Sequence, residues 1–475
     1  MRPNLLLGLF CLLIATLSSF SNASSLTFSE ARHLLARTGF GVVSPKEIEK
    51  FLPLSYEDAV DEILSGVREV SVQSAPVFKA NPLERRTVKD MDGPTRQAFN
   101  KRIKEDHYTL RNWWNREMLI TPSPFTERMV LFWHNHFVSE ASKVRFGKWL
   151  YDQNTTFRKH ATGDFRQLLT DISIGPAMLI YLDANKNKKN NPNENFAREI
   201  LELFTLGEGD QYTEDDIRES ARAYTGWMVN PFTAKFEFNI RTHDGHIKTF
   251  MGEEGNFDGK DIIRIILKKP EVGEFLALKL WKEFLSLEVD TSEVKRLGKI
   301  LFENDFALKP MLRELFLTEQ FRNPQIRGTL IKSPVELTLG TIRLLGNSNL
   351  DFRRLIYFQR SMGQNLFQPP DVRGWRGGTN WITSSTILTR EKFLKKVFQG
   401  VVNSKINMTK NMNPDKKLPF VNVDFSPLLA SEKREEGYLK RVFLAANSVT
   451  DKRQHGARFK TIRNLTLDPA YQVKS

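Results

Sequence analysis

Apolar residues recur at spacings of three and four positions in one segment after another, and this periodicity constrains the fold of the chain most. An apolar stripe at that spacing lies along one side of an α-helix and has to pack against other elements. The pattern is found in Phe28 to Leu64, Asn112 to Leu119, Phe125 to Phe137, Lys279 to Phe284, Ser292 to Phe302 and Lys309 to Phe316. We therefore predict an all-α fold, a predominantly helical, irregular multi-helix body with long loops.

Helix boundaries and the few non-helical stretches follow from local sequence. Thr213-Glu-Asp-Asp216 and Ser333-Pro-Val-Glu336 resemble capping boxes at helix starts, and Ser29 is a candidate N-cap for the first helix. Residues 230–252 alternate between apolar and polar side chains, so we expect at most a minor β-hairpin there. Residues 70–95 are polar and contain three prolines, which predicts a linker or a long excursion over the surface.

The N-terminus has the pattern of a secretory signal peptide. An apolar run from Leu5 to Phe20 follows Arg2 and ends in small residues up to Ala23. We predict a signal peptide at residues 1–23, a helical body at 24–393, and a C-terminal extension at 394–475 that is a loop and then helical. The mature chain is expected to be periplasmic or extracellular, and it holds no later run long enough to span a membrane.

Charge and cysteine content narrow the classes of function. The formal net charge is +14, which favours anionic partners such as envelope polymers, and nucleic acid is not expected for an exported protein. Cys11 is the only cysteine and lies in the leader, so no disulfide framework forms in the mature chain. The sequence has no serine nucleophile elbow, phosphate-cradling glycine loop or CxxC pair, which disfavours the corresponding chemistries.

Residues 193–207, NENFAREILELFTLG, predict an amphipathic helix with charged residues on one side. Glu194, Arg198 and Glu202 share that side, and Glu199 lies at its border. One interpretation is a site that uses these carboxylates. The other is a solvated face, in which Glu194 and Glu202 neutralise Arg198 at the i,i+4 spacing of a helix.

Two histidine-containing motifs supply imidazoles that could meet these acids. His134 and His136 lie in FWHNHF, and His243 and Asp244 lie in a polar turn, HDGH. Convergence of His134 or His136, His243 and a glutamate would match the mixed ligand sets of zinc or non-haem iron sites. The alternative is a buried histidine bonded to a backbone carbonyl and a plain Asp-Gly turn.

The segment from Gly363 to Trp381 combines two prolines, several glycines and two tryptophans. Trp375 and Trp381, if exposed beside Arg373 and Arg376, would suit stacking on sugar rings or binding of a partner segment. Alternatively, the tryptophans fix an irregular loop onto the helical body.

Six ordered motifs carry a resemblance to a known family. They are ARHLLARTGFG, FWHNHF, NENFAREILELFTLG, DIRESARAYTGW, HDGHIKTFMG and MGQNLFQPPDVRGW. Together they resemble a large bacterial family called domain of unknown function 1800, over about residues 26–393. The resemblance implies a mostly helical exported protein, often encoded beside a second exported family of sulfatase or phosphatase-like fold. It supplies no catalytic residues that can be carried over to this sequence.

Two functional hypotheses follow. The first is a metal-assisted hydrolase of an envelope or extracellular polymer, in which a divalent metal activates water and Arg198 stabilises negative charge. Its catalytic residues would be Glu202, Arg198 and His136, and its metal ligands would come from His134, His243, Glu194, Glu199 and Asp244. The second is a non-catalytic scaffold that binds a co-exported protein or an anionic polymer through Trp375, Trp381 and Arg373.

Overall fold

The structure is a computed structural model that describes residues 24–346, 350–407, 420–421, 436–449 and 458–475. It is predominantly helical, which confirms the predicted all-α class. The predicted signal peptide lies outside the described residues. Among the helices that are described, none combines the length and the apolar character needed to cross a membrane.

The helices of the first half begin near the N-terminus and continue to residue 223. They are α1 (Phe28–Thr38), α2 (Pro45–Phe51), α3 (Tyr56–Ser65), α4 (Gly93–Ile120), α5 (Pro124–His136), α6 (Ala141–Val144), α7 (Gly147–Lys159), α8 (Phe165–Ser173), α9 (Pro176–Tyr181), α10 (Asn195–Glu199), a π-helix (Ile200–Thr205) and α11 (Glu214–Ala223). The helices of the second half are α12 (Gly259–Ile266), α13 (Glu271–Phe284), α14 (Thr291–Glu303), α15 (Leu308–Leu317), α16 (Glu319–Arg322), α17 (Pro334–Leu345), α18 (Phe352–Ser361), α19 (Ser384–Asn407), α21 (Glu436–Phe443) and α22 (Arg458–Leu467).

Short antiparallel hairpins occupy the region where one was predicted, but there are two of them. β1 (Trp227–Val229) pairs with β2 (Phe236–Phe238), and β3 (Lys248–Phe250) pairs with β4 (Glu253–Gly255). Each strand has only three residues, so the hairpins depend on the helices beneath them for stability.

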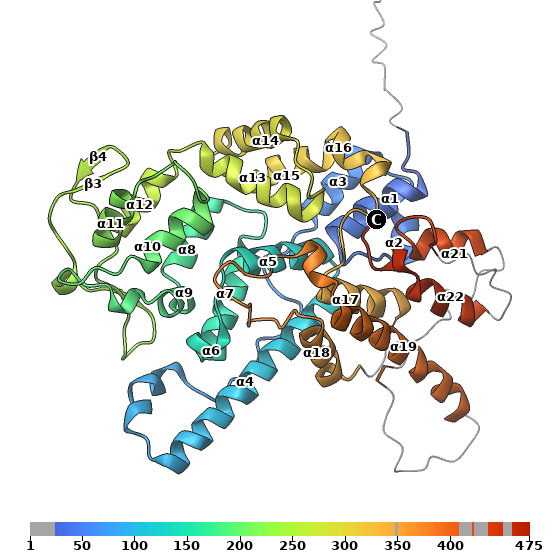
Figure 1. The fold of residues 1–475 in the computed structure, drawn as a ribbon, viewed down its shortest axis with the longest axis horizontal. Helices are drawn as coiled ribbons and strands as arrows, with labels where there is room; N and C mark the ends of the chain where they lie inside the picture. Colours follow the sequence, from blue (N-terminus) through green and yellow to red (C-terminus); the bar gives the residue numbers. More distant parts are fainter. Residues whose placement is uncertain (1–23, 347–349, 408–419, 422–435, 450–457) are drawn as a thin grey trace, which may run out of the picture.

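The helices form an elongated body around α5 (Figure 1). α10 to α12 and the hairpins lie at one end, α1 to α3 with α21 and α22 lie at the other, and α13 to α15 run along one edge. α5 is buried on every side, with Phe125, Trp133 and the other apolar residues of the helix in the core. A helix that is buried all round belongs to the interior of a large domain.

The polar segment of residues 70–95 is an excursion that packs along α4. The buried carboxylate of Glu117 accepts hydrogen bonds from the backbone N–H groups of Val72 and Gln73, both at 2.8 Å. Asp106, also buried, accepts from Lys79 and Ala80 at 2.8 and 2.9 Å. We call residues 67–120 the arm, which projects from the body in Figure 1.

Both predicted capping boxes are present, and both begin helices where the sequence placed them. Thr213 caps α11 together with Asp216, and Ser333 caps α17 together with Glu336. The N-cap expected at Ser29 was wrong, because the Thr27 hydroxyl accepts from the backbone of Glu30 and starts α1 two residues earlier.

The last residues of the chain return to the middle of the body. The backbone of Lys474 donates to Leu330 at 2.7 Å and accepts from Gly328 at 2.8 Å. Tyr471 is fully buried, and its hydroxyl lies 2.8 Å from that of Thr341 on α17. These contacts place the side chain of Lys474 beside the start of α17.

Candidate functional site

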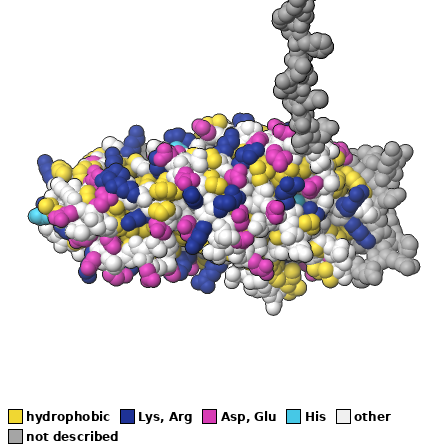
Figure 2. All heavy atoms as spheres, turned by 90° about the horizontal axis from the view of Figure 1, so that it is seen from above, with side chains coloured by type: hydrophobic (Ala, Val, Ile, Leu, Met, Phe, Trp, Pro, Cys, Tyr) yellow, Lys and Arg dark blue, Asp and Glu magenta, His cyan; other side chains and the backbone are white. Residues whose placement is uncertain are grey.

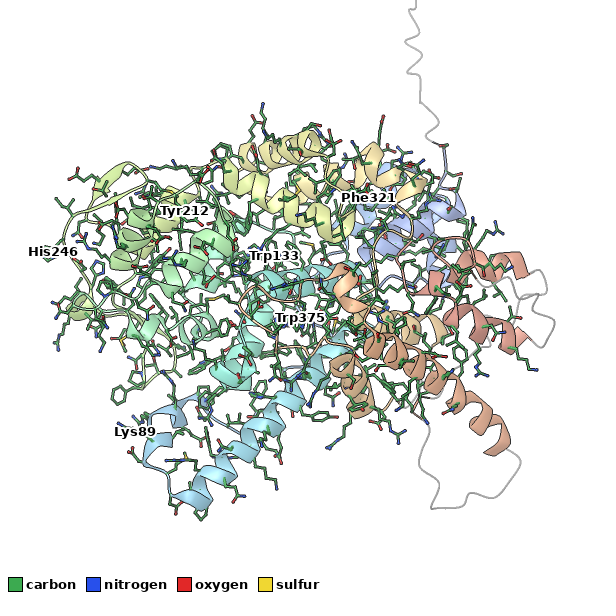
Figure 3. All side chains as sticks on the ribbon, viewed as in Figure 1. Lys89, Trp133, Tyr212, His246, Phe321 and Trp375 are labelled. Carbon is green, nitrogen blue, oxygen red and sulfur yellow. The ribbon has the colours of Figure 1, made fainter. Side chains whose placement is uncertain are left out.

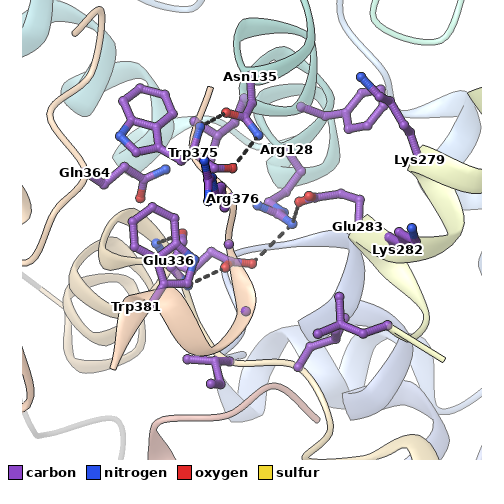
Figure 4. A pocket seen from close by; sticks show the side chains of 18 of the residues that line it. Arg128, Asn135, Lys279, Lys282, Glu283, Glu336, Gln364, Trp375, Arg376 and Trp381 are labelled. Carbon is purple, nitrogen blue, oxygen red and sulfur yellow. Dashed lines mark hydrogen bonds and ion pairs between the residues drawn. The ribbon is translucent and has the colours of Figure 1, made fainter. Parts of the chain in front are cut away.

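A cavity of about 320 Å³ lies in the middle of the body, between α5, α13, the start of α17 and the loop of residues 364–381. We call it the central pocket (Figure 4). Six cationic side chains line it against only two carboxylates, those of Glu283 and Glu336. The cations are Arg128, Lys279, Lys282, Arg373, Arg376 and Lys474. The pocket is therefore strongly electropositive.

The floor of the central pocket is a network of charges in which Arg128, Glu336 and Lys474 are buried and Glu283 is partly exposed. Arg128 forms ion pairs with both Glu283 and Glu336, and Lys474 lies 2.7 Å from Glu336. Burial by itself would raise the pKa of Glu336, but the charges of Arg128 and Lys474 outweigh it and hold that pKa at about 2. Glu336 therefore stays ionised and compensates the two cations that contact it.

Three cations of the central pocket have no acid partner among the residues that the structure describes. Lys279 is half-buried, whereas Lys282 and Arg376 are exposed at the mouth. Lys279 Nζ donates to the carbonyl oxygen of Leu203 at 2.9 Å and lies 3.2 Å from His136 Nδ1. An ammonium has three N–H donors. The third donor of Lys279 is thus available to a ligand.

His136 is neutral and holds Lys279 in place. Its Nε2 donates to the Phe204 carbonyl at 3.1 Å, so Nδ1 is left as the acceptor that faces Lys279. Burial and the charge of Lys279 keep the pKa of His136 well below its usual value. Burial and the nearby Lys282 also lower the pKa of Lys279, to about 8.

Lys279 and His136 donate to carbonyl groups at the end of the predicted amphipathic helix. That segment is not a regular α-helix, because it widens into the π-helix of residues 200–205, where the Thr205 hydroxyl bonds the Ile200 carbonyl. Leu203 and Phe204 lie in its last turn, where carbonyl groups have no partner within the helix. π-Helical turns are frequent at functional sites.

The FWHNHF motif also holds the loop that forms the opposite wall. His134 Nε2 accepts from the backbone N–H of Phe367 at 3.1 Å. The Asn135 side chain accepts from the N–H of Trp375 at 2.7 Å and donates to its carbonyl at 3.1 Å (Figure 4). Gly374 has φ +77°, and a Cβ there would lie 2.3 Å from Asn135 Oδ1. Only glycine fits this position.

The three residues predicted to bind a ligand all line the central pocket. Trp375 and Trp381 are each only 7% exposed, which agrees with the alternative in which they fix the irregular loop onto the helical body. They pack into the loop and present only part of their rings to the pocket, with Trp375 near the centre of Figure 3. Arg373 forms an ion pair with Glu208 at 2.5 Å.

The carboxylates of the predicted amphipathic helix lie outside the central pocket. Arg198 forms ion pairs with Glu194 at 3.1 Å, Glu202 at 3.2 Å and Glu214 at 2.8 Å. This is the neutralised face that was the second interpretation of the sequence. Glu199 is half-buried nearby, and burial together with the charge of Glu202 raises its pKa to about 7.

The HDGH turn belongs neither to the central pocket nor to the charged cluster around Arg198. His243 Nδ1 lies 2.9 Å from the Thr225 carbonyl and therefore donates to it. Asp244 forms an ion pair with Arg222 and a hydrogen bond with His246 Nδ1, both at 2.8 Å. Hydrogen bonds and the charge of Arg222 outweigh burial and lower the pKa of Asp244.

The predicted metal ligands do not converge. Within the described ranges, no group of three or more His, Cys, Asp or Glu side chains is placed to hold a metal ion. The reason is local, because His134 bonds the Phe367 backbone, Glu194 bonds Arg198, and His243 bonds Thr225. Glu199 and Asp244 likewise belong to different clusters. The one predicted catalytic residue that lines the central pocket is His136.

Comparison with known proteins gives a family. A family model described as protein of unknown function (DUF1800) matches residues 33–473. The chain belongs to the DUF1800 family. Searches of curated proteins and of solved structures returned no match. The DUF1800 match continues past residue 393 and includes α22, and thus covers most of the segment predicted as a C-terminal extension.

Sequence analysis missed four of the six cations that line the central pocket, which are Arg128, Lys279, Lys282 and Lys474. Two of them left a signal. Arg128 and Lys279 each interrupt an apolar run, in FTERMVLFW and FLALKLW. A charged residue inside such a run has to find a partner or line a cavity. Lys474 has no such signal in the sequence, because its position in the pocket depends on contacts with residues far away in the chain.

Proposed function

We propose that this protein binds anionic groups of an envelope or extracellular polymer in the central pocket, as a non-catalytic binding protein. The carrying observation is that Lys279, Lys282 and Arg376 line one cavity with no acid partner among the described residues. Uncompensated cations in a partly desolvated cavity attract sulfate, phosphate or carboxylate groups strongly. Action outside the cytoplasm rests on the predicted signal peptide.

The aromatic side chains of the pocket support a saccharide as the carrier of the anionic group. Trp375, Trp381 and Phe132 line the same cavity as the cations. Aromatic faces pack against the apolar faces of sugar rings, while cations bind the charged substituents. A volume of about 320 Å³ suits one charged sugar unit rather than a long chain.

The family resemblance is consistent with this ligand class. It implies a co-exported partner of sulfatase or phosphatase-like fold, and such enzymes act on sulfate or phosphate esters. We infer that the protein works beside such a partner by holding the anionic polymer.

Lys279→Met tests the proposal directly. Methionine keeps the length of the side chain and removes its charge, so we expect affinity for a sulfated disaccharide to fall about ten- to hundredfold, the worth of one hydrogen bond to a charged group. Isothermal titration calorimetry would measure this, with the unsulfated disaccharide as the ligand control. Lys295→Met, which removes an exposed lysine of α14, is the matched variant and should bind as the wild type does. Equal affinities for both variants would refute the proposal.

Binding is expected to weaken with rising pH. Lys279 is protonated below its pKa of about 8 and attracts an anion only in that form. Affinity for the sulfated disaccharide should be constant at lower pH and fall as pH rises through about 8, since the sulfate ester itself stays ionised. The measurement is a titration series across this range. Lys279→Arg should flatten the profile, and an unchanged decline in that variant would assign it to another group.

The same ligands distinguish binding from chemistry. Under the proposal, the sulfated saccharide is recovered intact after incubation. Cleavage products that require an added divalent metal and are lost in Glu202→Ala would instead support the metal-assisted hydrolase predicted from the sequence.

A further inference from the structure

A second electropositive cavity lies between the arm and the body. Its volume is about 690 Å³, and we call it the arm cavity. Arg85, Lys89 and Arg96 line it from the arm, and Lys143 and Arg145 line it from the body. Lys89 is labelled near the end of the arm in Figure 3. Among the described residues that line this cavity, none is acidic.

Four of these five cations are not compensated by a carboxylate. Lys143 pairs with Asp183 at 2.8 Å. Arg96 donates only to backbone carbonyl groups of the arm, and Arg145 donates to the side-chain oxygen of Asn100 at 2.6 Å. For Arg85 and Lys89, the described part of the chain provides no acid partner. Their charges therefore add up across the cavity.

The arm cavity is held in shape by buried contacts on both sides. The backbone bonds to Asp106 and Glu117 fix the path of the arm along α4. On the body side, Arg145 has φ +69°, which is unfavourable for a residue with a side chain, and His107 Nε2 donates to its carbonyl at 2.6 Å. Backbone strain of this kind persists only where the surroundings impose it, and it is common where a ligand is bound.

We propose that the arm cavity is a second subsite for the same anionic polymer, so that one chain occupies both cavities. This inference rests on the proposed function of the central pocket. Each cavity would bind a separate anionic group, and linking two binding events raises the affinity for a long chain far above that for a short one.

The shape of the charged surface favours a polymer over a lipid membrane. The uncompensated cations line a concave site, which a single chain can enter and a flat array of headgroups cannot. On the face of the body that Figure 2 shows, basic and acidic side chains are interspersed rather than gathered into one basic surface. A planar anionic membrane that approached this face, on the side of α13 to α15, would meet mixed charge.

The test compares two ligand lengths on the full chain. In Arg85→Gln/Lys89→Gln, affinity for a long sulfated saccharide should fall at least about tenfold, while affinity for the sulfated disaccharide stays unchanged. The matched control is Lys101→Gln/Lys104→Gln, which removes two exposed lysines of α4 that do not line the cavity. That control should bind both ligands as the wild type does.

Each outcome decides one of the two ideas. Equal affinities of both double variants for the long saccharide would overturn the arm subsite and leave the central pocket standing. Failure of the wild type to bind the disaccharide, with the long chain still weakened by the arm variant, would overturn the central pocket alone. If the arm variant loses binding to phosphatidylglycerol vesicles but not to the saccharide, the polymer assignment is refuted in favour of a lipid surface.

Discussion

Glu336→Gln is expected to lower the free energy of unfolding by about 3–5 kcal/mol, because it removes one partner of a buried charge network. Glu336 is 1% exposed and ion-paired with Arg128 and Lys474. Glutamine nearly matches its shape but not its charge. In the variant, the buried ammonium of Lys474 loses its carboxylate partner, and Arg128 keeps only its ion pair with Glu283. Urea denaturation followed by circular dichroism would measure the change.

The pH dependence of this loss has a defined direction. The pKa of Glu336 is lowered to about 2 in the folded protein, so its contribution is complete above the pKa of an unfolded glutamate, near 4.3. The difference between wild type and variant should therefore shrink as pH falls from about 4.3 toward 2. Glu62→Gln, at an exposed pair with Lys50, is the control and should cost at most about 1 kcal/mol. A similarly small cost at Glu336 would show that the network does not stabilise the fold.

Gly374→Ala is expected to displace the loop that carries Trp375 and Arg376. The new methyl group would lie 2.3 Å from Asn135 Oδ1 and 2.8 Å from the Asn135 carbonyl oxygen, in a backbone conformation with φ +77°. Strain of this kind costs about 1–3 kcal/mol, and relieving it breaks the paired hydrogen bonds between Asn135 and Trp375. Affinity for the sulfated disaccharide should fall about tenfold or more, since a displaced wall costs at least one charged hydrogen bond.

Gly377→Ala separates the steric clash from the backbone effect. Gly377 also has a positive φ, +70°, but a Cβ there would meet nothing closer than Trp381 Nε1 at 3.9 Å. Thermal melting and calorimetry on both variants give the comparison. Gly377→Ala should be destabilised only by the unfavourable backbone conformation and should keep most of the affinity for the sulfated disaccharide. If the two variants behave alike, contact with Asn135 does not position the loop.

Much of the fold was predictable because its signals are local. The capping boxes at Thr213 and Ser333 depend on residues three positions apart, and both are present. The periodicity that predicted helices also depends on near neighbours. The π-helix at residues 200–205 was not predicted, because apolar spacing does not distinguish a widened turn from a regular one.

The candidate site was predictable only in part, since its contacts join distant segments. The loop residues Trp375, Trp381 and Arg373 were singled out from composition, and they line the pocket. The acids around Arg198 were also singled out as candidate site residues, and they lie outside the pocket. Their i,i+4 spacing had already indicated the alternative, in which they neutralise Arg198. Glu336 was recognised as a helix cap, but its second role needs Arg128 and Lys474, which are far away in sequence.

This long-range charge network also links ligand binding to the order of folding. Arg128 and Lys474 reach Glu336 from early and late parts of the chain, so the central pocket exists only after both have docked on α17. Contacts of such sequence separation form late and slowly. An intermediate that lacks the final docking step presents no complete site. Under the proposed function, a polymer bound in the pocket would therefore select fully folded molecules and, by mass action, protect them against unfolding.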